Sequence, residues 1–188
     1  MVQVARRRIT VEQYQRMGEA GIIGPNERVE LIDGELVEMS PVGPPHAMTV
    51  WRWMRALTLS VSNDGFVWVQ NPVVTDDHSE PQPDLAVLRA KPEEYWEALP
   101  RPEDTLLVVE VSDSSLAYDR RTKARLYARS GIPQLVITDL VHNRVESHTD
   151  PGPDGYRTVR TLRRGDSLAL ASFPGRTIPL SSILREAP

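Results

Sequence analysis

The sequence predicts a mixed α/β (α+β) fold in which a central mixed sheet is flanked by helices. The 188 residues are 40% hydrophobic, which suits one domain with a sizeable core. An apolar, strand-like run at 105–111 precedes a helical pattern at 115–129 and a second apolar run at 135–138. Short strand-like segments separated by Gly and Pro turns then fill 144–180. No repeat or linker interrupts this pattern, so we expect a single domain over 1–188.

Three helices are expected before the central unit. Thr10 and Gln13 have the spacing of a capping box, which predicts a short helix that starts after Thr10. A longer helix is expected at 46–62, where apolar residues recur near the helical period. Its expected apolar face comprises Met48, Trp51, Met54 or Arg55, and Leu59. A further short helix is expected at 92–99.

The N-terminal region also predicts a β-hairpin. Asp33 and Gly34 lie between strand-like runs at 28–32 and 35–39, and Asp-Gly favours the type I′ turn of a two-residue hairpin. Further strand-like segments follow at 66–70, 73–75 and 85–88.

The central unit gives the clearest pattern in the chain. Apart from Glu110, the run at 105–111 is apolar, as is typical of a strand covered on both faces. The helix at 115–129 is closed by Gly131, and the strand at 135–138 follows. A strand, helix and strand in this order predict a right-handed crossover between parallel strands. The segments that follow are expected to form a C-terminal antiparallel extension.

Composition excludes several classes of protein. The absence of cysteine excludes disulfides, thiolate catalysis and cysteine-based zinc sites. No window approaches the roughly 18 continuous apolar residues of a membrane span. The basic run at residues 6–8 has no apolar stretch behind it, unlike a secretory signal, so we expect a cytoplasmic protein. A net charge of −4 is unusual for a nucleic-acid binder, although binding depends on local potential.

Three residues form the candidate catalytic set, namely Asp84, Glu110 and Lys123. Of the 22 Lys and Arg residues only Lys91 and Lys123 are lysines, and a compact ammonium suits contact with a phosphate or water. A charge such as Glu110 inside an apolar strand is costly unless it is paired or binds a metal. Two carboxylates suit Mg²⁺ or Mn²⁺, and the carbonyl of Val111 could add a third oxygen ligand.

The helix at 115–129 has two faces of different character. Lys123 shares its face with Asp119 and Tyr127, four residues to either side. Arg121, Arg125 and Arg129 fall on the opposite side, where we expect a solvated or ion-paired surface rather than a DNA-binding stripe. In an alternative without catalysis, Glu110 is a strand-end residue that pairs with Arg120 or another cation.

Several motifs occur along the chain in a characteristic order. They are Glu30-Leu31-Ile32-Asp33-Gly34-Glu35, Met39-Ser40-Pro41, His46, Pro83-Asp84, Val109-Glu110-Val111-Ser112, Asp119 with Lys123 and Tyr127, Gly131-Ile132-Pro133 and Asp139. Together they resemble the Uma2 (DUF820) family of the PD-(D/E)XK restriction-endonuclease-like superfamily. The resemblance extends from about Thr10 to Asp139. The C-terminal part from Asn143 lies outside it and is a candidate interface.

The resemblance implies a restriction-endonuclease-like core and a Mg²⁺- or Mn²⁺-dependent endonuclease that hydrolyses phosphodiester bonds in DNA. It also implies a homo-oligomer, by default a homodimer. The superfamily places its lysine two residues after the second acid, where this chain has Ser112. The resemblance therefore implies that Lys123 takes this role from the helix. Glu30 and His46 would be accessory residues, as a further acid and as a phosphate or water contact. Alternatively, Glu30 is a surface-strand residue and His46 a capping or packing residue.

Two other functions remain open at this level. One is a catalytically inactive binding or assembly module of the same fold, whose acids and lysine form a buried ion-pair network. The other is a metal-dependent hydrolase of smaller phosphoesters. A zinc hydrolase is disfavoured, because the four histidines show no ligand spacing and cysteine is absent.

Overall fold

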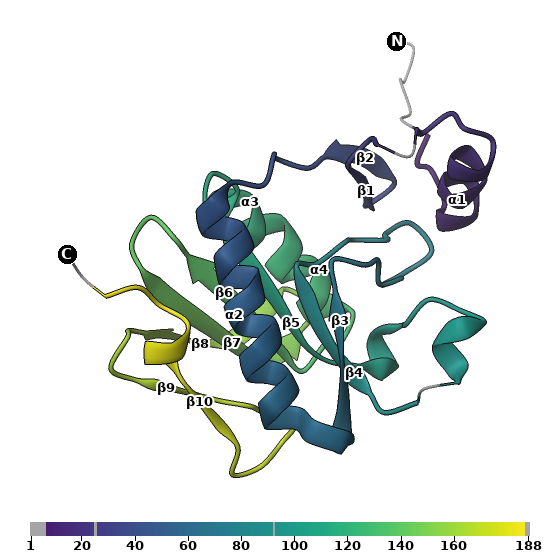
Figure 1. Ribbon diagram of the computed structural model, residues 1–188. Helices are drawn as coiled ribbons and strands as arrows, with labels where there is room; N and C mark the ends of the chain where they lie inside the picture. The colour runs from purple at the N-terminus through teal and green to yellow at the C-terminus, as the bar shows by residue number, and fades with distance from the viewer. Residues whose placement is uncertain (1–6, 25, 92, 187–188) are drawn as a thin grey trace.

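A computed structural model describes residues 7–24, 26–91 and 93–186. Its centre is a six-stranded mixed sheet in the order β3-β4-β5-β6-β7-β8 (Figure 1). Neighbouring strands are antiparallel, except that β5 and β6 are parallel. The strands are β3 (Gly65–Val69), β4 (Leu85–Arg89), β5 (Thr105–Ser112), β6 (Gln134–Asp139), β7 (Arg144–Gly152) and β8 (Gly155–Leu162).

The central unit has the predicted parallel pair joined through a helical segment. Every residue of β5 and β6 is buried, as expected for strands covered on both faces. The helical segment consists of α3 (Leu116–Tyr118), a π-helical turn (Asp119–Lys123) and α4 (Ala124–Arg129). The sequence predicted this helix but not its π turn. Such turns are rare and frequently occur at functional sites.

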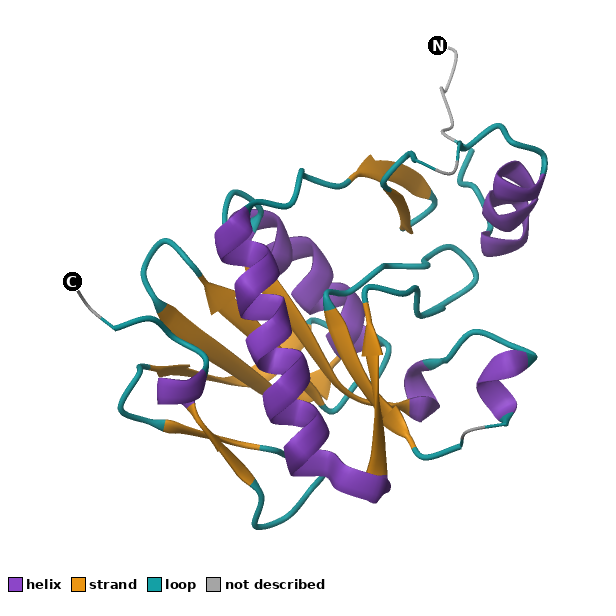
Figure 2. Ribbon diagram, in the orientation of Figure 1, coloured by secondary structure: helices purple, strands orange, loops and turns teal. Residues whose placement is uncertain are grey.

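Helix α2 (Pro44–Val61) covers one face of the sheet, and the segment from α3 to α4 lies on the other face (Figure 2). The apolar face predicted for this helix is wrong, because Met48, Trp51 and Leu59 are exposed. The buried face is formed by Val50, Trp53, Leu57 and Val61, a second set with helical spacing. Its central residue is Trp53, whose indole Nε1 donates to Thr138 Oγ1 at 2.8 Å.

The N-terminal elements confirm the predicted helix and hairpin. Helix α1 (Val11–Glu19) starts with the capping box of Thr10 and Gln13. Strands β1 (Val29–Ile32) and β2 (Glu35–Glu38) pair antiparallel around Asp33 and Gly34. These two residues have φ angles of 53° and 79°, as a type I′ turn requires.

Two local predictions are wrong. Residues 73–75 form no strand, because loop contacts such as Val74 N to Pro100 O use their backbone groups. Instead of a helix over 92–99 there is one 3₁₀ turn, Glu94–Trp96, and residue 92 lies outside the described residues.

The C-terminal segment is antiparallel as predicted. β7 and β8 extend the central sheet, while β9 (Ser167–Ala169) and β10 (Thr177–Pro179) form a separate hairpin. Among the described residues, no helix is long and apolar enough to cross a membrane.

Candidate functional site

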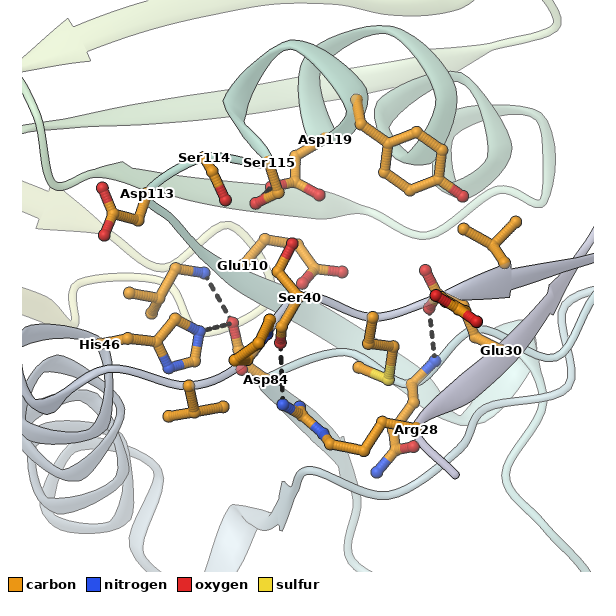
Figure 3. Close-up of a pocket in the computed structure, with 18 of the residues that line it drawn as sticks. Arg28, Glu30, Ser40, His46, Asp84, Glu110, Asp113, Ser114, Ser115 and Asp119 are labelled. Atoms are coloured by element: carbon orange, nitrogen blue, oxygen red, sulfur yellow. Dashed lines mark hydrogen bonds and ion pairs between the residues drawn. The ribbon is translucent and has the colours of Figure 1, made fainter. Parts of the chain in front are cut away.

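A cavity of about 340 Å³ opens at the end of the sheet where β4 begins and β5 ends. It is lined by residues from the hairpin to the start of α2, from the segment before β4, from the end of β5 and from the helical segment that follows. Figure 3 shows Asp84 and Glu110 side by side in this cavity, with Glu30 and Asp119 around them. The cavity therefore brings together acids that lie far apart in the sequence.

Asp84 sits immediately before β4, and three neighbours hold its carboxylate. Oδ2 accepts a hydrogen bond from the Val111 amide at 2.9 Å and lies 3.0 Å from His46 Nε2. Oδ1 accepts from Gln70 Nε2 at 3.3 Å. These contacts orient Asp84 beside the last residues of β5. His46, near the start of α2, thus contacts a candidate metal ligand directly.

Glu110 is the single charged residue of β5 and is buried. Its Oε1 accepts hydrogen bonds from Lys123 Nζ at 3.1 Å and from the Tyr127 hydroxyl at 2.7 Å. Burial raises the pKa of Glu110 to about 8, because Lys123 offsets only part of the effect and Asp119, Asp84 and Glu30 add to it. The structure therefore places Lys123 and Tyr127 where the helical spacing predicted them, facing Glu110.

Lys123 bridges two elements. Its Nζ lies 3.1 Å from Oε2 of Glu30 and 3.1 Å from Oε1 of Glu110. Burial alone would lower the pKa of Lys123, but the carboxylates of Glu110, Glu30 and Asp119 hold it above its usual value, so the ammonium stays charged. Glu30 is 3% exposed and also accepts from the Gln82 amide at 3.1 Å, so the surface-strand alternative for Glu30 is wrong.

Asp119, which lines the same cavity as Glu110, is held by two serines. Its Oδ2 accepts from Ser112 Oγ at 2.7 Å and from Ser115 Oγ at 2.6 Å. Ser112 occupies the position where the superfamily has its strand lysine. Here it instead ties the π turn to the end of β5.

Glu110 pairs with a cation, as the structural alternative expected, but this cation is Lys123 and not Arg120. Arg120 bonds to both oxygens of Glu146 and lies 3.4 Å from Asp139. It belongs to a separate charged network between the helical segment and strands β6 and β7. On the outer face of the segment, Arg129 pairs with Asp33 and Asp76, as expected for an ion-paired surface.

Sequence reasoning missed the polar residues that hold the acids in place. They are Gln70, Gln82 and Ser115, which contact Asp84, Glu30 and Asp119 respectively. Gln82 and Ser115 lie close in sequence to predicted site residues, which is the signal that could have found them. Gln70 offers no comparable signal, since its contact depends on the pairing of β3 with β4.

Residues 11–181 match the family model of Uma2, described as "Putative restriction endonuclease". The chain belongs to the Uma2 family. The resemblance inferred from the motifs is therefore confirmed, but its extent was set too short. The match includes β7 and β8, which lie beyond Asp139 and are strands of the same central sheet.

A solved structure has the same fold as this Uma2 protein. It is described as a putative nuclease belonging to DUF820 from Anabaena variabilis ATCC 29413. The TM-score is 0.68 at 12% sequence identity, and the alignment covers 93% of this chain and 97% of the other. At this identity the likeness shows the fold, which confirms the predicted restriction-endonuclease-like core. Among curated proteins, none matches this sequence.

Proposed function

We propose that this Uma2 protein is a Mg²⁺- or Mn²⁺-dependent endonuclease that hydrolyses phosphodiester bonds in DNA. One observation carries the proposal: Asp84, Glu110 and Lys123, from three different elements, meet in one cavity, with Lys123 Nζ 3.1 Å from Glu110. Family membership supports the nuclease class. The assignment of metal, substrate and residue roles rests on the chemistry of the cavity.

The donor set fits a hard divalent cation. Among the described residues that line the cavity, four have buried carboxyl groups and one, Lys123, has a buried ammonium group. The four acids are Glu30, Asp84, Glu110 and Asp119. Such an excess of buried acid is costly unless a cation balances it. No group of three His, Asp or Glu side chains in the described parts of the chain is arranged to hold an ion alone. Mg²⁺ suits this setting, since it is commonly bound by one or two carboxylates, waters and substrate phosphates.

In the proposed mechanism, Asp84, Glu110 and the carbonyl of Val111 would hold the ion. When bound, the ion would polarise the scissile phosphate and lower the pKa of a water molecule. Lys123, anchored between Glu30 and Glu110, orients that water or stabilises the charge that develops on the phosphate. Tyr127 fixes the Glu110 carboxylate, and His46 fixes Asp84.

The first test is a thermal-shift titration with Mn²⁺ and Mg²⁺ on the parent and on Asp84→Asn. Asp150→Asn, which removes an exposed acid that pairs with Arg157, is the charge-matched control. We expect metal to raise the Tm of the parent and the control but not that of Asp84→Asn. The same three proteins are then assayed for cleavage of DNA. Equal cleavage by the parent and Asp84→Asn would overturn the assignment.

A binding or assembly module of the same fold is the second candidate. The observation that favours it is that Lys123 contacts both Glu30 and Glu110 directly, so its ammonium already balances part of the buried negative charge without a metal. This candidate predicts no metal-dependent rise in Tm. A hydrolase of smaller phosphoesters is compatible with the size of the cavity, and a chromogenic phosphodiester separates it from a nuclease. The homodimer expected for this protein is tested by light scattering in solution.

A further inference from the structure

The acids of the cavity lie beneath a short segment that joins the hairpin to α2. We call this segment, residues 39–43, the strap. All five of its residues line the cavity, together with the acids. The exposed fractions of Asp84, Glu110 and Lys123 are 8%, 4% and 5%, so the candidate catalytic groups have little direct contact with solvent. In Figure 1 the connection from β2 to α2 crosses above the end of the sheet near α3.

Both ends of the strap are held. The Met39 amide donates to the Arg28 carbonyl at 2.8 Å, and Arg28 Nη1 donates to the Ser40 carbonyl at 2.9 Å. At the other end, Gly43 caps α2, and Pro44 and Pro45 restrict the backbone of its first turn. The strap is therefore a restrained cover rather than a loose loop.

The lining of the cavity combines two kinds of group. The strap contributes apolar groups, among them Met39, Pro41 and Val42, whereas buried acids come from β1, the residue just before β4, the end of β5 and the π turn. This arrangement suits a nucleotide whose phosphate faces the acids and whose base packs on the strap. Enzymes that enclose a base in a pocket act on an unpaired strand or extrude the nucleotide from the duplex, because a stacked and paired base is inaccessible.

A duplex fits this cavity poorly for two reasons. A duplex is stiff, with a persistence length of about 150 base pairs, so one phosphate cannot reach the buried acids without its neighbours. It also carries twice the charge per length of a single strand, one charge per ~1.7 Å. Glu38 and Asp113 expose their carboxylates at the rim of the cavity. Among the described residues that line the cavity, one exposed basic residue, Arg28, partly offsets their negative charge.

We infer that the substrate strand of this protein is unpaired at the scissile phosphate, so that single-stranded DNA, rather than intact duplex, enters beneath the strap. The inference rests on the proposed nuclease function and concerns whether the DNA that enters the same cavity is single-stranded or double-stranded.

The test compares a labelled single-stranded oligonucleotide with the same strand in a duplex, using the full chain and Mn²⁺. We expect the single strand to be cut at least about 100-fold faster, the factor expected if the duplex must first lose about two stacked base-pair steps. Glu110→Gln, prepared in the same way, controls for contaminating nuclease. Equal or faster cutting of the duplex overturns the inference but leaves the proposed function standing. Cleavage of a chromogenic diester alone also overturns it.

If neither DNA is cut, this result counts against the proposed function. A binding measurement then still tests the inference. Fluorescence anisotropy with Glu110→Gln should then show at least tenfold tighter binding of the single strand. Equal binding, or no binding of either DNA, overturns the inference.

A variant of the strap gives an independent readout. Arg28→Ala removes the contact with Ser40 and should lower the preference for single strands about tenfold, which is the usual worth of one charged hydrogen bond. Arg125→Ala, which removes an exposed arginine of α4 that does not line the cavity, should leave the preference unchanged. The same preference in both variants would exclude the strap as its cause.

Discussion

Lys123 Nζ lies 3.1 Å from Glu110 Oε1, although the two residues are thirteen positions apart in the chain. The contact joins the π turn to the buried strand β5, and Glu30 adds a second contact from the hairpin. A charged lysine that is 5% exposed is stable only because acids surround it. The same arrangement that stabilises this lysine also places it beside the acids proposed to hold a metal.

Loss of this lysine should destabilise the fold. Lys123→Ala leaves the buried Glu30 without its cation and Glu110 Oε1 without the lysine donor, and we expect the free energy of unfolding to fall by about 3–5 kcal/mol. Lys91→Ala is the matched control, since Lys91 is the other lysine of the chain and its side chain, which pairs with Asp104, is 37% exposed. Its loss should cost about 1 kcal/mol or less. Urea denaturation of both variants gives the comparison, and similar losses would show that the Lys123 contacts add little.

The stability of the metal-free protein should depend on pH through Glu110. The folded-state pKa of Glu110 is about 8, above its usual value of 4.5, because burial disfavours the charged form. The folded state therefore keeps a proton that the unfolded state releases, and stability is lost as the pH rises from about 4.5 through 8. Glu110→Gln cannot release this proton. In EDTA, its Tm should fall less than that of the parent between pH 5 and pH 8. An identical fall in both proteins would exclude Glu110 as the source.

The turn of the hairpin lies close to Arg8. Gly34 has a φ of 79°, and a Cβ at this position would meet the backbone and Cβ of Arg8. Gly34→Ala should therefore cost more than the roughly 1–2 kcal/mol expected from the left-handed backbone alone. Gly131→Ala is the control, because Gly131 has a φ of 81° with open space around it. Thermal denaturation should show the larger loss for Gly34→Ala. Equal losses would mean that Arg8 shifts freely.

A buried hydrogen bond links α2 to the sheet. Trp53 Nε1 donates to Thr138 Oγ1 at 2.8 Å, and both residues are fully buried. Thr138→Val leaves the indole N–H without a partner and should destabilise the protein by about 1–3 kcal/mol. In the Trp53→Phe background the same substitution should cost less, because no donor is then stranded. A double-mutant cycle in urea measures the difference, and additive effects would argue against the bond.

Local features of the chain were predictable where short-range physics decides them. The capping box at Thr10 and the turn at Asp33 and Gly34 depend on residues a few positions apart, and both were predicted correctly. β5 was predictable because a short, almost continuous apolar run is typical of a strand buried on both faces. The order of the motifs also sufficed to indicate the Uma2 family.

The site was predictable only in part. Glu110, Lys123 and Tyr127 were expected to meet, because helical spacing puts the last two on one face. The position of Glu30 was left open between a further acid of the site and a surface-strand residue, since a hairpin at the start of the chain can pack in many places. Asp119 was grouped with Lys123 by the same spacing, yet it bonds to Ser112. The π turn that begins at Asp119 leaves no clear signal in the sequence.

The sequence by itself determined the class of fold, the family, and the residue types available for chemistry. These follow from periodicity, turn residues and motif order, all of which act within or between adjacent elements. Only the tertiary structure decided which face of α2 is buried, how Glu30 reaches Lys123, and that the strap lines the same cavity as Asp84. Each of these depends on packing between segments far apart in the chain, where burial and charge pairing outweigh local preference.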